Sequence, residues 1–298
     1  MNSRLYFPLY VAVCIAFLAI PLWHISLLAW STDKYSHILI VPFISAYFLY
    51  DRRHESFAQS IVPGQTKAAG IITILSGLAM RLIVWKQPAA SAQQDWLAAL
   101  AFVLLIIGGF VLLHGFPREA RFPLLFLALM VPLPDAVMGR IIAFLQQGSG
   151  DVVSALYSLL GIPFLREGVV FHLPRGSIEI AQECSGIRSS IALLVLSLIA
   201  GEMLLRSVWR KLLLTASILP LVLIKNGIRI VVLSLLGFYV NPSFLTGPLH
   251  RDGGILFWFL SLAIWTPWLT FLRRSETKRN HSNQIPADSP ALPEVSAI

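Results

Sequence analysis

Long apolar stretches separated by short polar segments run along most of the chain. A helix that crosses a bilayer needs about 20 mostly apolar residues, so the pattern predicts an all-α integral membrane protein, a polytopic bundle of about eight transmembrane helices. The second stretch is short, and we expect the seventh to bend or break at Lys225–Arg229. The stretches cover residues 7–30, 36–51, 69–86, 97–114, 122–138, 185–205, 212–238 and 254–272.

The segment between the fifth and sixth stretches has a different pattern. Residues 141–160 are apolar with polar interruptions, which is typical of an amphipathic helix on the membrane surface, a re-entrant segment or an additional pair of spans. The residues that follow alternate between apolar and polar around Pro174-Arg175-Gly176. This alternation predicts a short outer β-hairpin that leads directly into Cys184.

The composition agrees with lipid as the solvent. Hydrophobic residues make up 56% of the chain and charged residues 13%, whereas a soluble domain has about 45–50% and about 25%. We therefore expect one polytopic membrane domain over residues 1–274. The polar, proline-containing residues 275–298 are expected to form a disordered cytoplasmic tail.

The net charge of +8 comes mainly from loops beside the apolar stretches. With the N-terminus inside, 13 of the 23 lysines and arginines fall on inner segments, which is the bias of cytoplasmic loops. The sequence has no glycine-rich phosphate loop, zinc-finger spacing or aromatic RNA-binding motif, so we expect no nucleic-acid partner. Its two cysteines form no CxxC motif, so we expect no metal and no cofactor.

The first stretch with candidate chemistry surrounds Cys184, at the predicted start of the sixth span. A helix N-terminus favours a thiolate through its unpaired N–H groups and its dipole. Arg188 follows four residues later, on the same helical face, and could stabilise a thiolate further. The alternative is that Cys184 is a small packing residue among serines and a glycine.

Two further stretches carry charged or titratable residues at the same predicted depth. Arg229 lies about 26 Å along the seventh span, close to the outer face of a hydrocarbon core about 30 Å thick. Its alternative role is to reach the outer headgroups. His250 stands just before the eighth span, also on the outside. A histidine in this position suits proton transfer; the alternative is that it is an ordinary polar residue of the loop. A nucleophile, an acid/base and a cation would thus converge on one side of the membrane.

These residues resemble the motifs of the exosortase/archaeosortase family of polytopic membrane cysteine transpeptidases. The resemblance covers about residues 30–270. Ile38 departs from the pattern, because exosortases often have glycine after the histidine. The matching pieces are Glu183-Cys184-Ser185-Gly186-Ile187-Arg188-Ser189, Asn226-Gly227-Ile228-Arg229-Ile230 and His250, with support from Tyr35-Ser36-His37, Val41-Pro42 and Pro132-Leu133-Pro134.

The resemblance implies an activity and its partners. Exosortase-like proteins are thought to cleave a C-terminal sorting signal on exported proteins, which consists of a short motif, often Pro-Glu-Pro, a transmembrane helix and a basic tail. They pass the protein through a thioester acyl-enzyme to a surface acceptor. Expected partners are therefore such exported proteins and membrane lipid. The expected location is the inner membrane of a bacterium, with the active site facing the periplasmic side.

The resemblance also assigns residue roles. It implies that Cys184 is the nucleophile, Arg229 the essential arginine and His250 the essential histidine. Arg188, Glu183 and Asn226 are candidates for supporting or substrate-binding roles. His37 and His172 are rivals for proton transfer, since both face outward in the predicted topology.

Other classes of function are compatible with parts of this pattern. A transporter or channel would need a polar path through the whole membrane, whereas the embedded charges concentrate in the outer half. A membrane lipid or polysaccharide transferase in envelope biogenesis commonly uses acidic residues and a metal, and no such outer cluster stands out. A scaffold for envelope assembly would not need Cys184.

Overall fold

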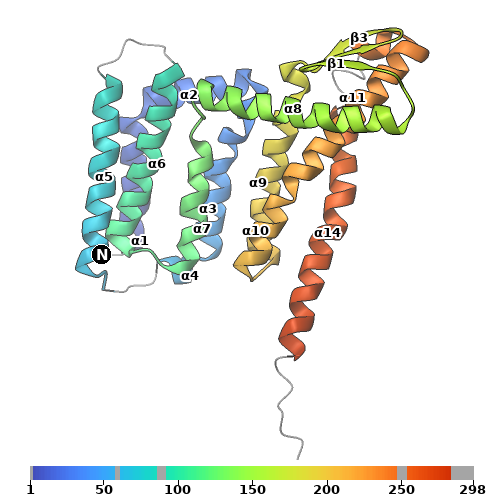
Figure 1. Cartoon of the computed structure of the whole chain (residues 1–298). Helices are drawn as coiled ribbons and strands as arrows, with labels where there is room; N and C mark the ends of the chain where they lie inside the picture. Colours follow the sequence, from blue (N-terminus) through green and yellow to red (C-terminus); the bar gives the residue numbers. More distant parts are fainter. Residues whose placement is uncertain (1–2, 58–60, 86–91, 247–253, 283–298) are drawn as a thin grey trace, which may run out of the picture. The chain divides into compact units, whose positions relative to one another are not determined.

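The structure is a computed structural model that describes residues 3–57, 61–85, 92–246 and 254–282. Helices dominate it, and the chain divides into two compact units, Met1–Leu145 and Gln146–Ile298 (Figure 1). The predicted fold class, an all-α membrane protein with a small sheet before Cys184, is confirmed. The structure does not test whether the chain forms one membrane domain followed by a tail.

The first unit is built of helices joined by short turns. Its longest pair, α5 and α6, packs closely, because Gly70 and Gly108 have no side chain at the contact. A Cβ atom built on Gly70 would lie 2.8 Å from the backbone nitrogen of Leu112. The elements are α1 (Ser3–Phe17), α2 (Ala19–Ser31), the 3₁₀ helix η1 (Asp33–Leu39), α3 (Val41–Asp51), α4 (Arg53–Ser56), α5 (Gly64–Trp85), α6 (Ala92–His114), α7 (Arg118–Phe126), η2 (Leu127–Met130) and the first part of α8 (Asp135–Leu159).

The second unit combines helices with a small antiparallel sheet. Within this unit, the sheet lies at the end where α9 begins and α11 ends (Figure 1). The elements after α8 are β1 (Leu165–Glu167), β2 (Val170–Leu173), β3 (Gly176–Glu179), η3 (Gln182–Ser185), α9 (Ile187–Leu204), α10 (Val208–Ala216), α11 (Ile218–Tyr239), α12 (Ser243–Thr246) and α14 (Gly254–Ser282).

The structure shows a multi-span membrane protein, but the predicted number of eight spans is not confirmed. In the described residues, five helices are long and apolar enough to cross a membrane, or up to seven if each of two bent pairs is one span. Five predicted spans are confirmed, at 69–86, 97–114, 185–205, 212–238 and 254–272. The corresponding helices are Gly64–Trp85, Asp95–His114, Ile187–Leu204, Val208–Tyr239 and Leu256–Thr277.

The other three predicted spans are interrupted. The stretch 7–30 breaks at Leu18, where α1 and α2 meet with a bend of 79°. The stretch 36–51 is divided between η1 and the 11 residues of α3, with Pro42 in the first turn of the new helix. The stretch 122–138 ends at Met130, and Pro132 and Pro134 precede a bend of 94° into α8.

One expectation about helix continuity needs correction, and the structure narrows another. The predicted break at Lys225–Arg229 is wrong, because α11 runs without interruption from Ile218 to Tyr239 and the break from α10 falls at Ser217. Residues 141–160 form most of one continuous helix, α8, which excludes a pair of spans there.

The predicted hairpin is present and has a third strand. Leu173 pairs with Gly176 across a two-residue turn of Pro174 and Arg175, which confirms the predicted turn. The extra strand β1 pairs with β2 through a second tight turn that begins at Gly168, whose φ of 62° favours glycine. This strand has only three residues, too few to show an alternating pattern.

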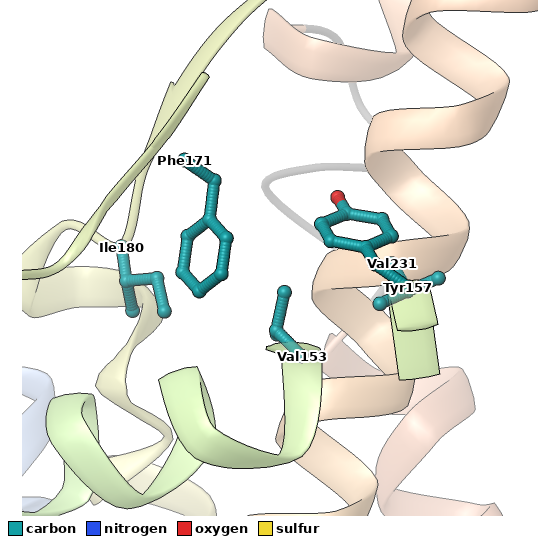
Figure 2. Packing of buried hydrophobic residues seen from close by; sticks show 5 residues of the cluster. All are labelled: Val153, Tyr157, Phe171, Ile180 and Val231. Atoms are coloured by element: carbon teal, nitrogen blue, oxygen red, sulfur yellow. The ribbon is translucent and has the colours of Figure 1, made fainter. Parts of the chain in front are cut away.

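A buried apolar cluster fixes the sheet on α8 and α11. Phe171 and Ile180 from the sheet region pack against Val153 and Tyr157 of α8 and Val231 of α11 (Figure 2). The hydroxyl of Tyr157 lies 2.6 Å from that of Ser234, so its one polar atom is paired inside the cluster. Ile180 stands two residues before η3, so this packing also fixes the approach to Cys184.

Three polar contacts hold the same segment on α8 from outside the cluster. The side-chain amide of Gln146 donates to the carbonyl of Ile180 at 2.6 Å. The guanidinium of Arg166 contacts the carboxylate of Asp151 at 2.7 Å and the hydroxyl of Ser154 at 3.2 Å. The segment that leads into Cys184 is thereby attached to α8 at Arg166 and again at Ile180.

Candidate active site

Cys184 lies in the turn between the sheet and α9. The turn consists of η3 and Gly186, and α9 begins at the next residue, Ile187. The backbone therefore places Cys184 just before a helix N-terminus, as the sequence predicted. The side chains of Glu183 and Cys184 lie outside the described residues.

The shape of this turn depends on Gly186. Its φ of 80° is in the left-handed region that glycine adopts at little cost. A Cβ atom at this position would lie 3.4 Å from the side-chain amide carbon of Asn226 on α11, so α11 passes directly beside the turn. The carbonyl of Gly186 accepts hydrogen bonds from the hydroxyls of Ser189 and Ser190 at 2.9 and 2.8 Å. These hydrogen bonds fix the first turn of α9 to Gly186, the residue that follows η3.

Two buried polar residues on α11 link the turn to its neighbours. Lys225 donates from its ammonium group to the hydroxyl of Ser189 at 2.6 Å. Asn226 donates from its side-chain amide to the hydroxyl of Ser149 on α8 at 3.0 Å. Asn226 was predicted as a supporting residue, whereas Ser149 and Ser189 received no role from the sequence. Serines inside apolar helices look like small packing residues until their partners are known.

The two arginines of the predicted site belong to the helices that meet at this turn. Arg188 is an exposed residue in the first turn of α9. Arg229 lies one helical turn beyond Lys225 on α11 and is half-buried. The structure therefore brings Arg188, Asn226 and Arg229 into the unit and onto the helices that carry the Cys184 turn.

The three candidate histidines lie in different places. His172 is on β2, where its Nδ1 atom is 2.8 Å from the hydroxyl of Ser177 and its Nε2 atom is 3.6 Å from a carboxylate oxygen of Glu167. His37 is in η1 of the first unit, where burial lowers the pKa of its imidazole and so favours the neutral form. His250 lies outside the described residues. Which histidine transfers protons is a prediction that these positions do not test.

The first unit has a pocket of its own, with a volume of about 490 Å³. None of the residues predicted for the site lines this pocket. It is lined by Leu28, Thr32, Lys34, Tyr35, Asp95, Trp96, Pro132, Leu133, Pro134 and Asp135. In the described part of the chain, no group of three or more histidines, cysteines and carboxylates could hold a metal ion.

Close packing of α11 on α8 positions the polar pair of Lys225 and Asn226. A Cβ atom on Gly227 would lie 2.8 Å from the Cβ atom of Val152 and 2.4 Å from one of its methyl carbons. We therefore expect Gly227→Ala to destabilise the protein by about 1–3 kcal/mol through overpacking. The measurement is a thermal melt of the purified protein in detergent.

The control for this prediction is Gly139→Ala in α8, where a Cβ atom would meet nothing within 4 Å. This variant is expected to melt at or above the wild-type temperature, since alanine is a better helix former than glycine. The double variant Gly227→Ala with Val152→Ala is expected to recover part of the lost stability. Equal melting temperatures for Gly227→Ala and the wild type would contradict the close contact.

Comparison with known proteins adds one finding. A family model described as transmembrane exosortase (Exosortase_EpsH) matches residues 29–266. That range includes the Cys184 turn, all of α11 and position 250. The search of curated proteins found no match. The search of solved structures found none either.

Proposed function

The chain belongs to the transmembrane exosortase family, and from this membership we propose that it is a membrane-embedded cysteine transpeptidase. Its substrates are exported proteins with a C-terminal sorting signal, made of a short motif, a transmembrane helix and a basic tail. The enzyme cleaves at the motif and transfers the protein to a surface acceptor. It resides in the inner membrane with the active site on the periplasmic side.

The observation that best supports the proposal is the position of Cys184 in the chain fold. It precedes the N-terminus of α9, in a turn that α11 contacts with the helical face carrying Lys225 and Asn226. A nucleophile needs a fixed backbone and nearby groups that favour developing negative charge. The start of α9 and the cationic stretch of α11 are groups of that kind.

The first half of the proposed reaction is acylation of Cys184. The thiolate attacks the scissile carbonyl, and negative charge develops on the carbonyl oxygen, where Arg229 stabilises it. His250 protonates the departing amine as the C–N bond breaks. The products of this half are a thioester on Cys184 and the released signal, which retains the transmembrane helix and the basic tail.

The second half transfers the acyl group to the acceptor. His250 removes a proton from the acceptor nucleophile, which attacks the thioester carbonyl and displaces the Cys184 thiolate. Water in place of the acceptor gives hydrolysis. In this proposal Arg188, a residue of the first turn of α9, favours the thiolate, while Glu183 and Asn226 support the site or contact the substrate.

The transmembrane helix of the substrate is expected to supply much of the binding. It packs against the spans of the enzyme by close contact of small and apolar side chains. Binding of this helix fixes the scissile bond at the depth of the outer interface. The bond is then held in a defined orientation toward the catalytic residues. Substrate recognition then depends on the helix and the motif together.

The test is co-expression of the chain with a tagged exported protein that ends in Pro-Glu-Pro, a transmembrane helix and a basic tail. The expected result is a shorter tagged product on a gel only when both the chain and the complete signal are present. Matched controls replace the motif with alanines or omit the chain. A product of the same size and amount without the chain would contradict the proposal.

A further inference from the structure

Lys225 is a buried cation within a membrane-spanning helix. Only 3% of the residue is exposed, and it lies eight positions into α11. Taking an ammonium group out of water costs several kcal/mol, so a buried lysine in a membrane helix needs a reason. Lys225 stands directly before the motif that begins at Asn226, but no step of the proposed reaction uses it.

The hydrogen bonds of Lys225 lead to the Cys184 turn. Its ammonium donates to the hydroxyl of Ser189 at 2.6 Å, and that hydroxyl donates in turn to the carbonyl of Gly186 at 2.9 Å. Ser189 therefore accepts from the lysine with a lone pair and uses its only proton on the carbonyl. These two hydrogen bonds connect α11 to the turn. The proton of the Ser189 hydroxyl is held by the carbonyl of Gly186, so the hydroxyl is not arranged to act as a nucleophile.

The carbonyl of Gly186, which ends this series of hydrogen bonds, is well placed to fix the conformation of the turn. Gly186 is the left-handed residue that joins η3 to α9, two residues after Cys184. A charge-assisted hydrogen bond is stronger than a neutral one, and polarisation along a chain of hydrogen bonds strengthens each member. The ammonium of Lys225 thus stabilises, through Ser189, the peptide group of Gly186. This peptide group determines how the backbone runs from Cys184 into α9.

We propose that Lys225 is a positioning residue, which holds the Cys184 turn in its reactive geometry through Ser189 and the carbonyl of Gly186. The inference rests on the proposed role of Cys184 as nucleophile. It adds a residue that contacts neither substrate nor acceptor. It also accounts for a buried charge that packing alone would disfavour.

The reactivity of Cys184 toward iodoacetamide tests this proposal without a protein substrate. Each variant is made in a Cys14→Ala background, and the rate of alkylation is followed by mass spectrometry of the Cys184 peptide. Lys225→Met keeps the length of the side chain and removes the ammonium. It is expected to lower the alkylation rate by about tenfold to a hundredfold, the range for loss of a hydrogen bond to a charged group.

Conservative and control variants separate positioning from packing. Lys225→Arg keeps a cationic donor and is expected to retain more reactivity than Lys225→Met. The methionine variant is nevertheless expected to melt at or above the wild-type temperature, because it removes a buried charge. Lys211→Met removes a lysine on α10 that pairs with Glu202, and it controls for the loss of a positive charge from the same unit.

A pair of serine variants tests the link without changing the lysine. Ser189 and Ser190 both donate to the carbonyl of Gly186, but the lysine donates to Ser189. Ser189→Ala is expected to lower the alkylation rate by about tenfold, and Ser190→Ala by much less. This pair remains informative if Lys225→Met fails to fold.

Two results would overturn the proposal: wild-type alkylation rates in a folded Lys225→Met, or equal effects of Ser189→Ala and Ser190→Ala. Neither result bears on whether Cys184 is the nucleophile. Failure of the proposed function appears separately, as processing of the sorting signal that persists in Cys184→Ala.

Discussion

Replacing Cys184 with alanine is expected to abolish cleavage of the sorting signal, with a loss of about four orders of magnitude or more in rate. The reason is that the proposed reaction passes through a thioester, and alanine has no atom that can form one. The measurement is the rate of appearance of the shortened tagged substrate in membranes that contain equal amounts of each variant.

The second cysteine provides the matched control. Cys14 lies in α1 with 5% of its surface exposed, and it belongs to the first unit. Cys14→Ala removes a thiol as well, but it is expected to retain nearly all of the processing activity. Processing by Cys184→Ala at the wild-type rate would exclude a cysteine nucleophile at this position.

Replacing Arg229 with alanine is expected to lower kcat/KM for the sorting signal by about 10²- to 10³-fold, the loss seen when one oxyanion donor is removed. Its position on α11, one turn beyond Lys225, places a guanidinium on the helix that passes the Cys184 turn. The measurement is a kinetic comparison of purified variants with a substrate that carries the complete signal.

The division between kcat and KM distinguishes two roles for this arginine. Stabilisation of the oxyanion predicts a fall in kcat, and Arg229→Lys keeps part of the activity because one donor suffices. Bidentate binding of a substrate carboxylate predicts a rise in KM that lysine does not reverse. The control is Arg140→Ala, which removes an exposed arginine on α8. Unchanged kinetics in Arg229→Ala would contradict both roles.

Much of the fold follows from the apolar pattern of the sequence. The helices α5, α6, α9, α11 and α14 are long, nearly uninterrupted apolar runs, and all five were predicted as spans. The break at Leu18 was missed because it lies within an apolar run, although Pro21 in the first turn of α2 marks the start of a new helix there. Near Pro132 and Pro134 the residue types did carry the signal for a break, but the predicted span was extended across it.

The site was only partly predictable for a different reason. The residues of the two motifs, and Lys225 beside the second, were found because cysteine, lysine, asparagine and arginine are unusual in apolar surroundings. Their partners were not found, because the contact between Lys225 and Ser189 joins residues 36 positions apart and that between Asn226 and Ser149 joins residues 77 apart. Such contacts depend on how α8, α9 and α11 pack, and a single sequence carries no direct record of that packing.

The glycines of α11 and of the turn also have roles that the sequence alone does not reveal. The sequence places Gly186 and Gly227 inside the two motifs, but it does not say which of them is required by conformation and which by space. Gly186 has a left-handed backbone, whereas Gly227 sits in a regular helix against Val152. The structure therefore assigns a conformational reason to the first glycine and a packing reason to the second.

Direct detection of the acyl-enzyme tests the central claim most closely. The purified protein is mixed with a substrate carrying the sorting signal, quenched rapidly in acid, and analysed by intact mass and peptide mapping. The account predicts an adduct that has the mass of the N-terminal part of the substrate, lies on Cys184 and is released by hydroxylamine, as expected of a thioester. An adduct on another residue such as Ser189, or one that forms equally in Cys184→Ala, would contradict it.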